Sequence, residues 1–597
     1  MSGIVGILNR DGAPVERDLI ARMTNFLSFR GPDAQDFWID GNVAFGHTLF
    51  RSTCEADTEH QPLTLDGKVW LTADVRLDGR RDLIAKLENK LGTPLKTTLN
   101  DAELLLHSYE AWQDDCVKHL LGDFAFAICD AKRERLFCAR DQLGVRQFYY
   151  SANEDLFVFS NTLNCLRQHP RVSNKLNELA IGDFLLFGLN QEKETTVFAD
   201  IQRLPKAHIL VVSREGVSLR EYWTPSTSVV QYKKEDDYIA RFRELLNTAV
   251  ADRLRTQRVG ISLSGGLDSS AVAASAIKSK PEISACCVVY DSAFPDEERN
   301  YAALVAEALD IPLEFIDAGE INQQETTGIA PEPFDVDPIH VASSELLRRL
   351  STHARVALTG WDGDTFLNET PKHSFAKSLK NRNVGRLLFD LLRYAHLQRS
   401  PPPIGIRTQW RRWRNPHWNR SPFPVWLNED FSKRLDLVER WRQVNAEREL
   451  AHPDRPRAFR VLHSPSWDFL FSRYDAGSTL LPLEVRHPLI DVRMVDYLLA
   501  LPVIPWLLDK AIMRKAMTGV LPDAIVRRPK SPLAGDPGLH LRHTKKFQNI
   551  DGFNPVTALS SFVDRKSIPK VTEEVDSNLL WINVRPFSLN QWLAHSR

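Results

Sequence analysis

The stretch VGISLSGGLDSSAVAASAIK, residues 259–278, decides the fold of the second half of this chain. The run VGISL predicts a strand, SGGLDSS at 264–270 predicts a loop, and AVAASAIK predicts a helix. Two glycines allow a tight turn whose backbone amides point inward, and three serine hydroxyls and the helix N-terminus face the same spot. The stretch therefore predicts an anion cradle, which is not a Walker loop because GxxxxGK followed by Ser or Thr is absent.

Asp268 lies inside this predicted cradle and indicates that a divalent cation binds there. A carboxylate beside phosphate groups needs a cation between them, so the loop implies Mg²⁺. Two later runs, ISACCVVY (283–290) and ARVALTG (354–360), also predict strands, and each is followed by a loop and a helical sequence. Repeated units of this kind predict a parallel α/β domain.

The loop resembles the pyrophosphatase loop of N-type ATP pyrophosphatases, and residues 236–597 resemble the ATP-dependent amide ligase domain of the asparagine synthetase family. The resemblance implies an α/β PP-loop (adenine nucleotide α-hydrolase-like) fold with a helical C-terminal region. It implies that Asp364, in LTGWDGDTF (358–366), holds Mg²⁺ on the leaving pyrophosphate together with Asp268. Either Val288 or Val289 would lie beside the adenine. The implied ATP-binding residues are Ser264, Gly265, Gly266, Asp268, Ser269, Ser270, Val289, Thr359 and Gly360.

Two further residues match catalytic positions of the family. Lys530, in RRPKSPL (527–533), matches a lysine that stabilises charge on the reacting phosphate and on the tetrahedral intermediate. Glu484 matches a glutamate that helps to deprotonate the attacking amine in β-lactam-forming relatives. The alternative for Lys530 is a solvated surface lysine, and for Glu484 a structural ion pair with Arg486.

The N-terminal part alternates short β-type runs with turns, which predicts layered sheets. Its motifs SGIVGI (2–7), FRGPD (29–33) and GDFAFAICD (122–130) resemble the N-terminal-nucleophile glutaminase domain. We therefore expect an α+β Ntn-hydrolase-like sandwich over residues 1–215. A polar, turn-rich connector separates it from the second domain at 236–597.

The glutaminase chemistry is expected to be lost. A working member has Cys directly after the initiator Met, so that the α-amine of that Cys acts as its base, whereas this chain has Ser2. The glutamine-binding Asn-Gly-Glu segment reads Ala73-Asp74-Val75, and the glutamine-clamping arginine reads Leu49, with Arg51 nearby. Of the glutamine-site residues that the resemblance implies, Asp101 alone is kept. The domain is therefore predicted to be a scaffold for the synthetase half.

The reaction class that the resemblance implies is adenylation of a carboxylate followed by displacement of AMP by an amine. Trp361 stands where asparagine synthetases carry Glu and β-lactam-forming relatives carry Tyr. The start MSG and the segments VRLDGR (75–80), RHPLID (486–491) and RPKSPL (528–533) resemble lasso peptide macrolactam synthetases. That branch implies a precursor peptide as substrate, with a leader peptidase and a leader-binding protein as partners. An ammonia-dependent asparagine synthetase, or another small-molecule amide or β-lactam synthetase, remains the alternative.

An insertion at about 372–426 is basic and rich in tryptophan. It could bind an acidic or aromatic peptide or a partner protein, or it could be a solvated surface. Single-stranded nucleic acid on basic and aromatic side chains is a less favoured interpretation, because nothing else in the chain suggests nucleic acid. A non-catalytic pseudo-enzyme is disfavoured because the ATP-site motifs are intact.

The bulk composition excludes several other classes. With 597 residues the chain is too long for one hydrophobic core, and a net charge of −1 gives no overall bias towards nucleic acid or membranes. No run of about 18 apolar residues exists. The first residues lack the features of a signal peptide, so we expect a cytoplasmic protein. The seven cysteines show no spacing typical of zinc.

Overall fold

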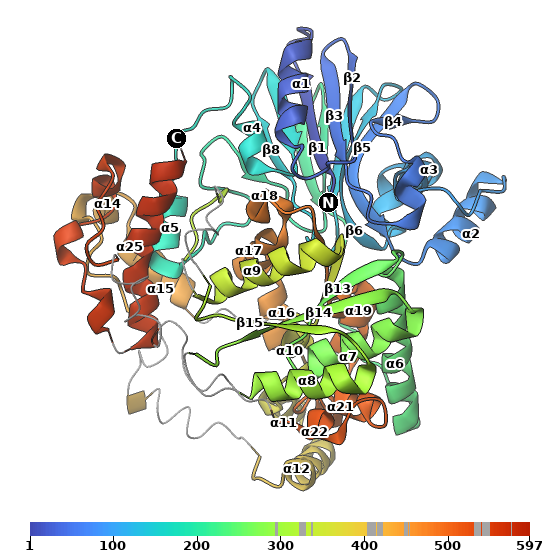
Figure 1. Ribbon diagram of the computed structural model, residues 1–597, viewed down its shortest axis with the longest axis vertical. Coiled ribbons are helices and arrows are strands. Elements are labelled where there is room, and N and C mark those ends of the chain that lie inside the picture. The colour runs from blue at the N-terminus through green and yellow to red at the C-terminus, as the bar shows by residue number, and fades with distance from the viewer. Residues whose placement is uncertain are drawn as a thin grey trace.

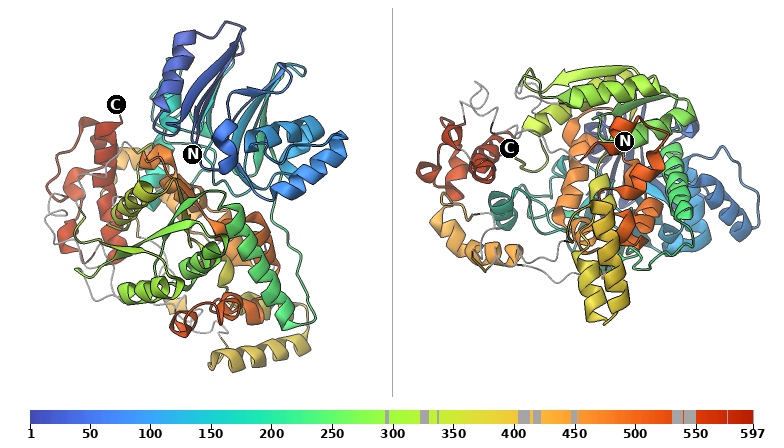
Figure 2. Two further views of the ribbon diagram at one scale, coloured as in Figure 1. Left: turned by 45° about the vertical axis from the view of Figure 1, so that its right-hand side comes forward. Right: turned by 90° about the horizontal axis from the view of Figure 1, so that it is seen from below.

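The computed structural model divides into an N-terminal pair of sheets, at the top of Figure 1, and a later α/β part that lies directly below and against them (Figures 1 and 2). The structure describes residues 1–597 except 293–296, 322–329, 336–337, 403–412, 415–421, 447–451, 453, 530–538, 540–549, 575 and 597.

Two six-stranded antiparallel sheets form the N-terminal part. In order, the first contains β10 (Gln202–Arg203), β8 (Tyr149–Ala152), β9 (Leu156–Ser160), β1 (Gly3–Asn9), β3 (Val43–Leu49) and β2 (Ala34–Asp40). The second contains β12 (Gly216–Glu221), β11 (His208–Ser213), β7 (Arg135–Arg140), β6 (Gly122–Asp130), β5 (Val69–Leu77) and β4 (Leu63–Thr64). The strands extend past the predicted boundary at residue 215, because β12 pairs along β11.

A hydrophobic core joins the two sheets face to face. Ile4 and Phe45 of the first sheet and Ala127 and Cys138 of the second belong to one buried cluster. Helix α1 (Arg17–Phe26) packs on the first sheet, and α3 (Asp101–Trp112) packs on the second beside α2 (Arg80–Leu91). Helix α3 begins where it does because its N-terminus carries a capping box. This arrangement confirms the predicted Ntn-hydrolase-like α+β sandwich.

The second part is built on a five-stranded parallel sheet. Its order is β15 (Leu313–Asp317), β14 (Glu282–Val289), β13 (Arg258–Ser262), β16 (Val356–Thr359) and β17 (Glu484–Arg486). Its main helices are α6 (Glu235–Asp252), α7 (Leu267–Ala276), α8 (Glu298–Leu309) and α9 (Pro338–His353). The predicted strand–loop–helix order over 259–278 is confirmed as β13, a loop and α7.

Helices make up most of the chain after β16, which confirms the predicted helical C-terminal region. Those that matter for the site are α10 (Gly363–Leu367), α17 (Pro465–Tyr474), α18 (Ala476–Thr479), α19 (Val492–Ala500), α20 (Val503–Trp506) and α21 (Ala511–Met517). The last helix of the chain, α25 (Ser577–His595), packs on α5 (Glu178–Phe187) of the N-terminal part.

The first part of the predicted insertion is a helical hairpin of α11 (Lys372–Lys380) and α12 (Val384–Gln398), at the lower edge of Figure 1. One side of α12 packs on Val503 and Ile504, while Phe389 and Leu392 on another side are exposed. Of the tryptophans in the insertion, Trp410 and Trp418 lie outside the described residues. Among the described residues, no helix combines the length and apolarity that crossing a bilayer requires.

Candidate active site

A cavity of about 440 Å³ opens at the carboxyl ends of the central strands of the parallel sheet. The loops that follow parallel strands converge at that edge, which is where ligands bind in folds of this class. Seven of the predicted ATP and metal residues line the cavity: Ser264, Gly266, Asp268, Ser269, Thr359, Gly360 and Asp364.

Three predicted ATP-site residues do not line the cavity. Val288 lines the cavity and Val289 does not, because successive side chains of a strand point to opposite faces. Val289 instead packs among buried apolar residues. Gly265 and Ser270 instead shape the loop: Gly265 has a φ of +60°, and the Ser270 hydroxyl donates to the Gly266 carbonyl at 2.7 Å. Lys530 lies outside the described residues.

The loop is held closed by hydrogen bonds between its own serines. The backbone amide of Ser264 donates to Ser269 Oγ at 3.1 Å, and the two hydroxyl oxygens are also 3.1 Å apart. Gly360, after β16, lies directly against this loop. A Cβ at Gly360 would stand 2.3 Å from the backbone nitrogen of Ser269, so only glycine lets the two loops meet.

We expect Gly360→Ala to lower the rate of ATP-dependent pyrophosphate release by about 10²-fold, because a shift of roughly 1 Å in a reacting group costs that much. The clash is with backbone atoms, which cannot turn aside as a side chain can. The matched control is Gly385→Ala in α12, where a Cβ would meet nothing within 4 Å. Equal activity of both variants, measured as pyrophosphate release, would contradict the tight packing of the two loops.

Lys510 lies between the two predicted metal carboxylates and was missed in the sequence. Its Nζ donates to Asp268 Oδ2 at 2.6 Å and is 2.8 Å from Asp364 Oδ1. Burial alone lowers the pKa of Lys510, but the two carboxylates outweigh it and raise that pKa above its ordinary value. No spacing in the sequence links a lysine of DKAIMRK (509–515) to Asp268, which lies in a distant part of the chain.

The arrangement of Asp268 and Asp364 fits a magnesium ion. A cationic group already stands between the two carboxylates, within 2.8 Å of each. Among the described residues no cluster of three or more His, Cys, Asp or Glu can hold a metal. Two carboxylates are nevertheless what Mg²⁺ takes from a protein when phosphates and water supply its other ligands. The residues present therefore fit a metal that arrives with ATP.

Trp361 forms an aromatic wall at one side of the cavity. Its ring packs near those of Phe471, Tyr474 and His487, with centroids 5.7, 6.5 and 5.9 Å away respectively. Burial lowers the pKa of His487 to about 3, so the imidazole is neutral; its Nδ1 is 2.7 Å from Thr359 Oγ1. At this side of the cavity the indole ring of Trp361 neither carries a charge nor transfers a proton.

Glu484 does not line the cavity, so the structure gives no support to its predicted role in deprotonating an amine. It pairs in register with Val356, the first residue of β16, whereas the cavity lies at Thr359, the last. Its carboxylate is buried and accepts from Arg486 Nε at 2.9 Å and from Arg146 Nη2 at 2.7 Å.

The electrostatics of Glu484 agree with a structural role. Burial alone would raise its pKa, yet Arg486 and Arg146 hold the pKa well below its ordinary value. A carboxylate held ionised between two guanidinium groups is a poor base. The structure therefore agrees with the alternative interpretation, in which Glu484 forms an ion pair with Arg486. A second ion pair joins Glu484 to Arg146 of the N-terminal part.

The residues predicted to form a degenerate glutaminase site are bound by the protein's own groups. Asp101 accepts from Arg255 Nη2 at 2.5 Å and from the backbone amide of Leu77 at 2.9 Å, and it is also paired with Arg80. Arg255 and Arg80 more than offset the effect of burial and lower the pKa of Asp101. The predicted site residues Ser2, Leu49 and Ala73 are all buried, and Ser2 Oγ accepts from the amide of Phe50 at 3.1 Å.

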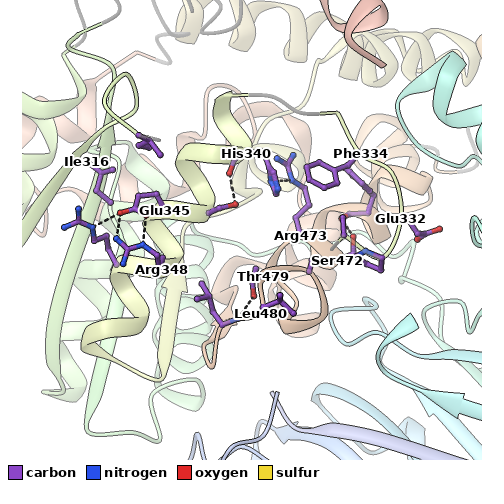
Figure 3. Close-up of a pocket in the computed structure, with 18 of the residues that line it drawn as sticks. Ile316, Glu332, Phe334, His340, Glu345, Arg348, Ser472, Arg473, Thr479 and Leu480 are labelled. Carbon is purple, nitrogen blue, oxygen red and sulfur yellow. Dashed lines mark hydrogen bonds and ion pairs between the residues drawn. The ribbon is translucent and has the colours of Figure 1, made fainter. Parts of the chain in front are cut away.

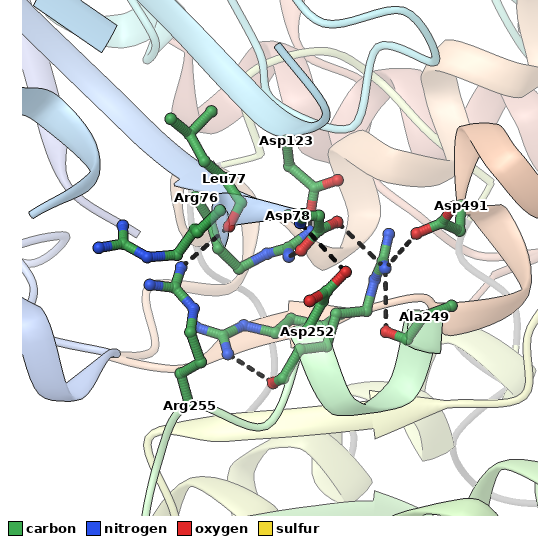
Figure 4. A network of polar contacts seen from close by, with 12 residues as sticks. Arg76, Leu77, Asp78, Asp123, Ala249, Asp252, Arg255 and Asp491 are labelled. Atoms are coloured by element: carbon green, nitrogen blue, oxygen red, sulfur yellow. Dashed lines mark hydrogen bonds and ion pairs between the residues drawn. The ribbon is translucent and has the colours of Figure 1, made fainter. Parts of the chain in front are cut away.

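A buried ion-pair network continues from this site and joins the two parts of the chain (Figure 4). Arg76 of β5 contacts Asp123 at 2.6 Å and Asp78. Arg253, just after α6, contacts Asp78 at 3.2 Å and Asp491, the N-cap of α19, at 2.8 Å. The N-terminal part thus holds α6 and α19 of the synthetase half by matched charges that are out of contact with water.

We expect Ser2→Ala to leave ATP-dependent synthesis unchanged, because Ser2 makes no contact with the ATP cavity. The loss of one buried hydrogen bond would lower the free energy of unfolding by about 1 kcal/mol. Product formation and the thermal unfolding midpoint should be measured on the same preparations. Loss of synthesis with an unchanged midpoint would show that the N-terminal residue takes part in the reaction.

Comparisons with known proteins agree with both parts of the fold. Residues 1–223 match the glutamine amidotransferase domain family, and residues 241–593 match the asparagine synthase family. The chain is similar to asparagine synthetase [glutamine-hydrolyzing] 3 of Bacillus subtilis (strain 168), with 29% identity over 97% of this chain and 94% of the relative.

Two further relatives carry similar names. Asparagine synthetase [glutamine-hydrolyzing] 2 of the same organism is 25% identical over 96% of this chain and 77% of its own length. A putative asparagine synthetase [glutamine-hydrolyzing] 2 of Methanocaldococcus jannaschii is 31% identical over 46% of this chain and 56% of its own length. With the ATP-type loop, the paired carboxylates and a family match over more than half of its length, the chain belongs to the asparagine synthase family of ATP-dependent ligases that form carbon–nitrogen bonds.

Proposed function

We propose that this ligase closes a macrolactam ring in a lasso precursor peptide, joining the peptide's own N-terminal amine to an Asp or Glu side chain. The observation that carries the proposal is the occupied glutaminase site. Asp101, the one residue kept from the glutamine site, is already bound to Arg255 and Arg80. An amine derived from glutamine is therefore not expected, and the amine has to come with the substrate or as ammonia.

The first step forms an adenylate. A carboxylate oxygen of the peptide bonds to the α-phosphorus of ATP, and the bond from that phosphorus to the bridging oxygen of pyrophosphate breaks. Backbone amides and hydroxyls of the 264–270 loop at the N-terminus of α7 would bind the phosphates, and the Lys510 ammonium would offset their charge. Mg²⁺, bound by Asp268 and Asp364, would neutralise charge on the leaving pyrophosphate.

The second step forms the amide. The amine nitrogen bonds to the activated carbonyl carbon, the bond from that carbon to the phosphate oxygen breaks, and AMP leaves as the nitrogen loses a proton. The ring of Trp361, packed with Phe471 and Tyr474, would keep water away from the adenylate and so limit its hydrolysis. An apolar wall of this kind suits an amine delivered by the substrate better than it suits an ammonium ion.

The alternative is ammonia-dependent synthesis of asparagine from aspartate, or of another small amide or β-lactam. The names of the relatives favour it, since those in B. subtilis and M. jannaschii are called asparagine synthetases. The two functions share the adenylation step and differ only in the carboxylate and the amine.

The test is mass spectrometry of a candidate precursor peptide. The peptide is incubated with the enzyme, ATP, Mg²⁺ and the expected cytoplasmic partners, a leader peptidase and a leader-binding protein. Loss of one water together with AMP, absent with Asp268→Ala, would support ring closure. An unchanged peptide mass beside asparagine formation from aspartate and ammonium in a parallel reaction would favour the alternative.

A further inference from the structure

A second and larger cavity, of about 730 Å³, shares helix α9 as a wall with the ATP cavity. Figure 3 shows this second cavity. It lies between the end of β15 and α9 on one side and α17 and α18 on the other. Figure 3 places Glu345 and Arg348 at one end of this cavity and Phe334 and Arg473 at the other. Neither of the two reaction steps proposed above uses this second cavity.

Helix α9 is a wall common to both cavities. Residues spaced three or four apart lie on one helix face, so two stripes of α9 point in different directions. The stripe towards the ATP cavity contains Ile339, Ala342, Ser343 and Leu346. The stripe towards the second cavity contains His340, Ser344, Glu345 and Arg348. At the end of α17 the neighbours Arg473 and Tyr474 divide in the same way, Arg473 lining the second cavity and Tyr474 the ATP cavity.

The lining of the second cavity combines apolar surface with charges of both signs. Phe334 and Phe469 supply aromatic rings, and Glu345 is bound to Arg348 at 2.6 Å. Arg473 Nε donates to His340 Nδ1 at 3.0 Å. Burial and the nearby Arg473 lower the pKa of His340 to about 3, so the imidazole that accepts this hydrogen bond is neutral. Such a mixed lining suits a polypeptide better than a nucleotide or another simple anion.

The volumes of the two cavities also favour a peptide as the ligand of the second cavity. Pockets for ligands of drug size have volumes of about 300–1,000 Å³. The ATP cavity, at about 440 Å³, is the smaller of the two, and the predicted nucleotide and metal residues already make up much of its lining. We propose that the second cavity binds a segment of the peptide substrate remote from the bond being formed, an inference that rests on the proposed function. The peptide would lie along α9, with its reacting carboxylate on the side of the ATP cavity.

The test fills the second cavity without touching the ATP cavity. Ser344→Phe puts a ring into it from α9, and Thr479→Phe puts one into it from α18. The matched control is Thr352→Phe, which adds the same ring at an exposed position on the same helix. The probe is the leader-trimmed peptide with a fluorescent label, and its dissociation constant is measured by anisotropy. The KM for ATP is measured in parallel.

We expect both filling variants to weaken peptide binding about tenfold or more and to raise the KM for the peptide, with the KM for ATP and kcat unchanged. Thr352→Phe should match the wild type. Wild-type affinity in a filling variant that keeps its KM for ATP would overturn the inference, as would failure of the wild-type enzyme to bind the peptide. Binding that depends on this cavity without ring closure would leave the inference standing and refute the proposed function instead.

Discussion

Replacing either Asp268 or Asp364 by asparagine should reduce pyrophosphate release by about 10²–10³-fold, the effect of removing one preorganised group that stabilises charge in a transition state. Both side chains line the ATP cavity, and both contact Lys510. Loss of one carboxylate removes a ligand for the metal on pyrophosphate and frees Lys510 from a position set by two charges. The measurement is release of pyrophosphate with a saturating carboxylate substrate.

The neighbouring Asp362 provides a matched control for this prediction. Burial, with added repulsion from Asp364 and Asp268, raises the pKa of Asp362 to about 6. Its carboxylate accepts from Thr365 Oγ1 at 2.6 Å and does not line the cavity. Asp362→Asn should therefore keep most of the activity. If the Asp268 and Asp364 variants were as active as Asp362→Asn, the assignment of the metal carboxylates would fail.

Glu484→Ala should lower the free energy of unfolding by about 3–5 kcal/mol, because removing one member of a buried ion pair leaves its partners charged and uncompensated. The partners here are Arg146 and Arg486, both fully or almost fully buried. They come from the N-terminal part and from β17 respectively, so the change should weaken the contact between the two parts of the chain. The midpoint of thermal unfolding is the direct readout.

An exposed ion pair serves as the control for Glu484. Glu439 and Arg442 are 3.5 Å apart on the surface, where such pairs contribute about 0–1 kcal/mol. Glu439→Ala should hardly move the unfolding midpoint. If Glu484→Ala instead kept the wild-type midpoint and abolished amide formation while pyrophosphate release continued, Glu484 would have to be restored as the base that deprotonates the amine.

The sequence predicted those parts of the ATP site that are encoded in short stretches. The loop at 264–270 and Asp364 end up at one cavity because both follow strands of the same parallel sheet, and parallel strands present their carboxyl ends at one edge. It could not decide between Val288 and Val289. A strand buried on both faces is apolar throughout, so ACCVV shows no alternation to read.

The sequence by itself determined the two folds, their order along the chain and the position of the predicted nucleotide loop, because each depends on patterns within a few tens of residues. Only the tertiary structure decided that Lys510 lies between Asp268 and Asp364. It also decided that Glu484 binds two arginines and that Asp101 forms an ion pair with Arg255. These contacts join residues far apart in the chain, and a charged residue in the sequence does not specify its partner. The partner is fixed only when burial removes the charge from water and makes a nearby opposite charge necessary.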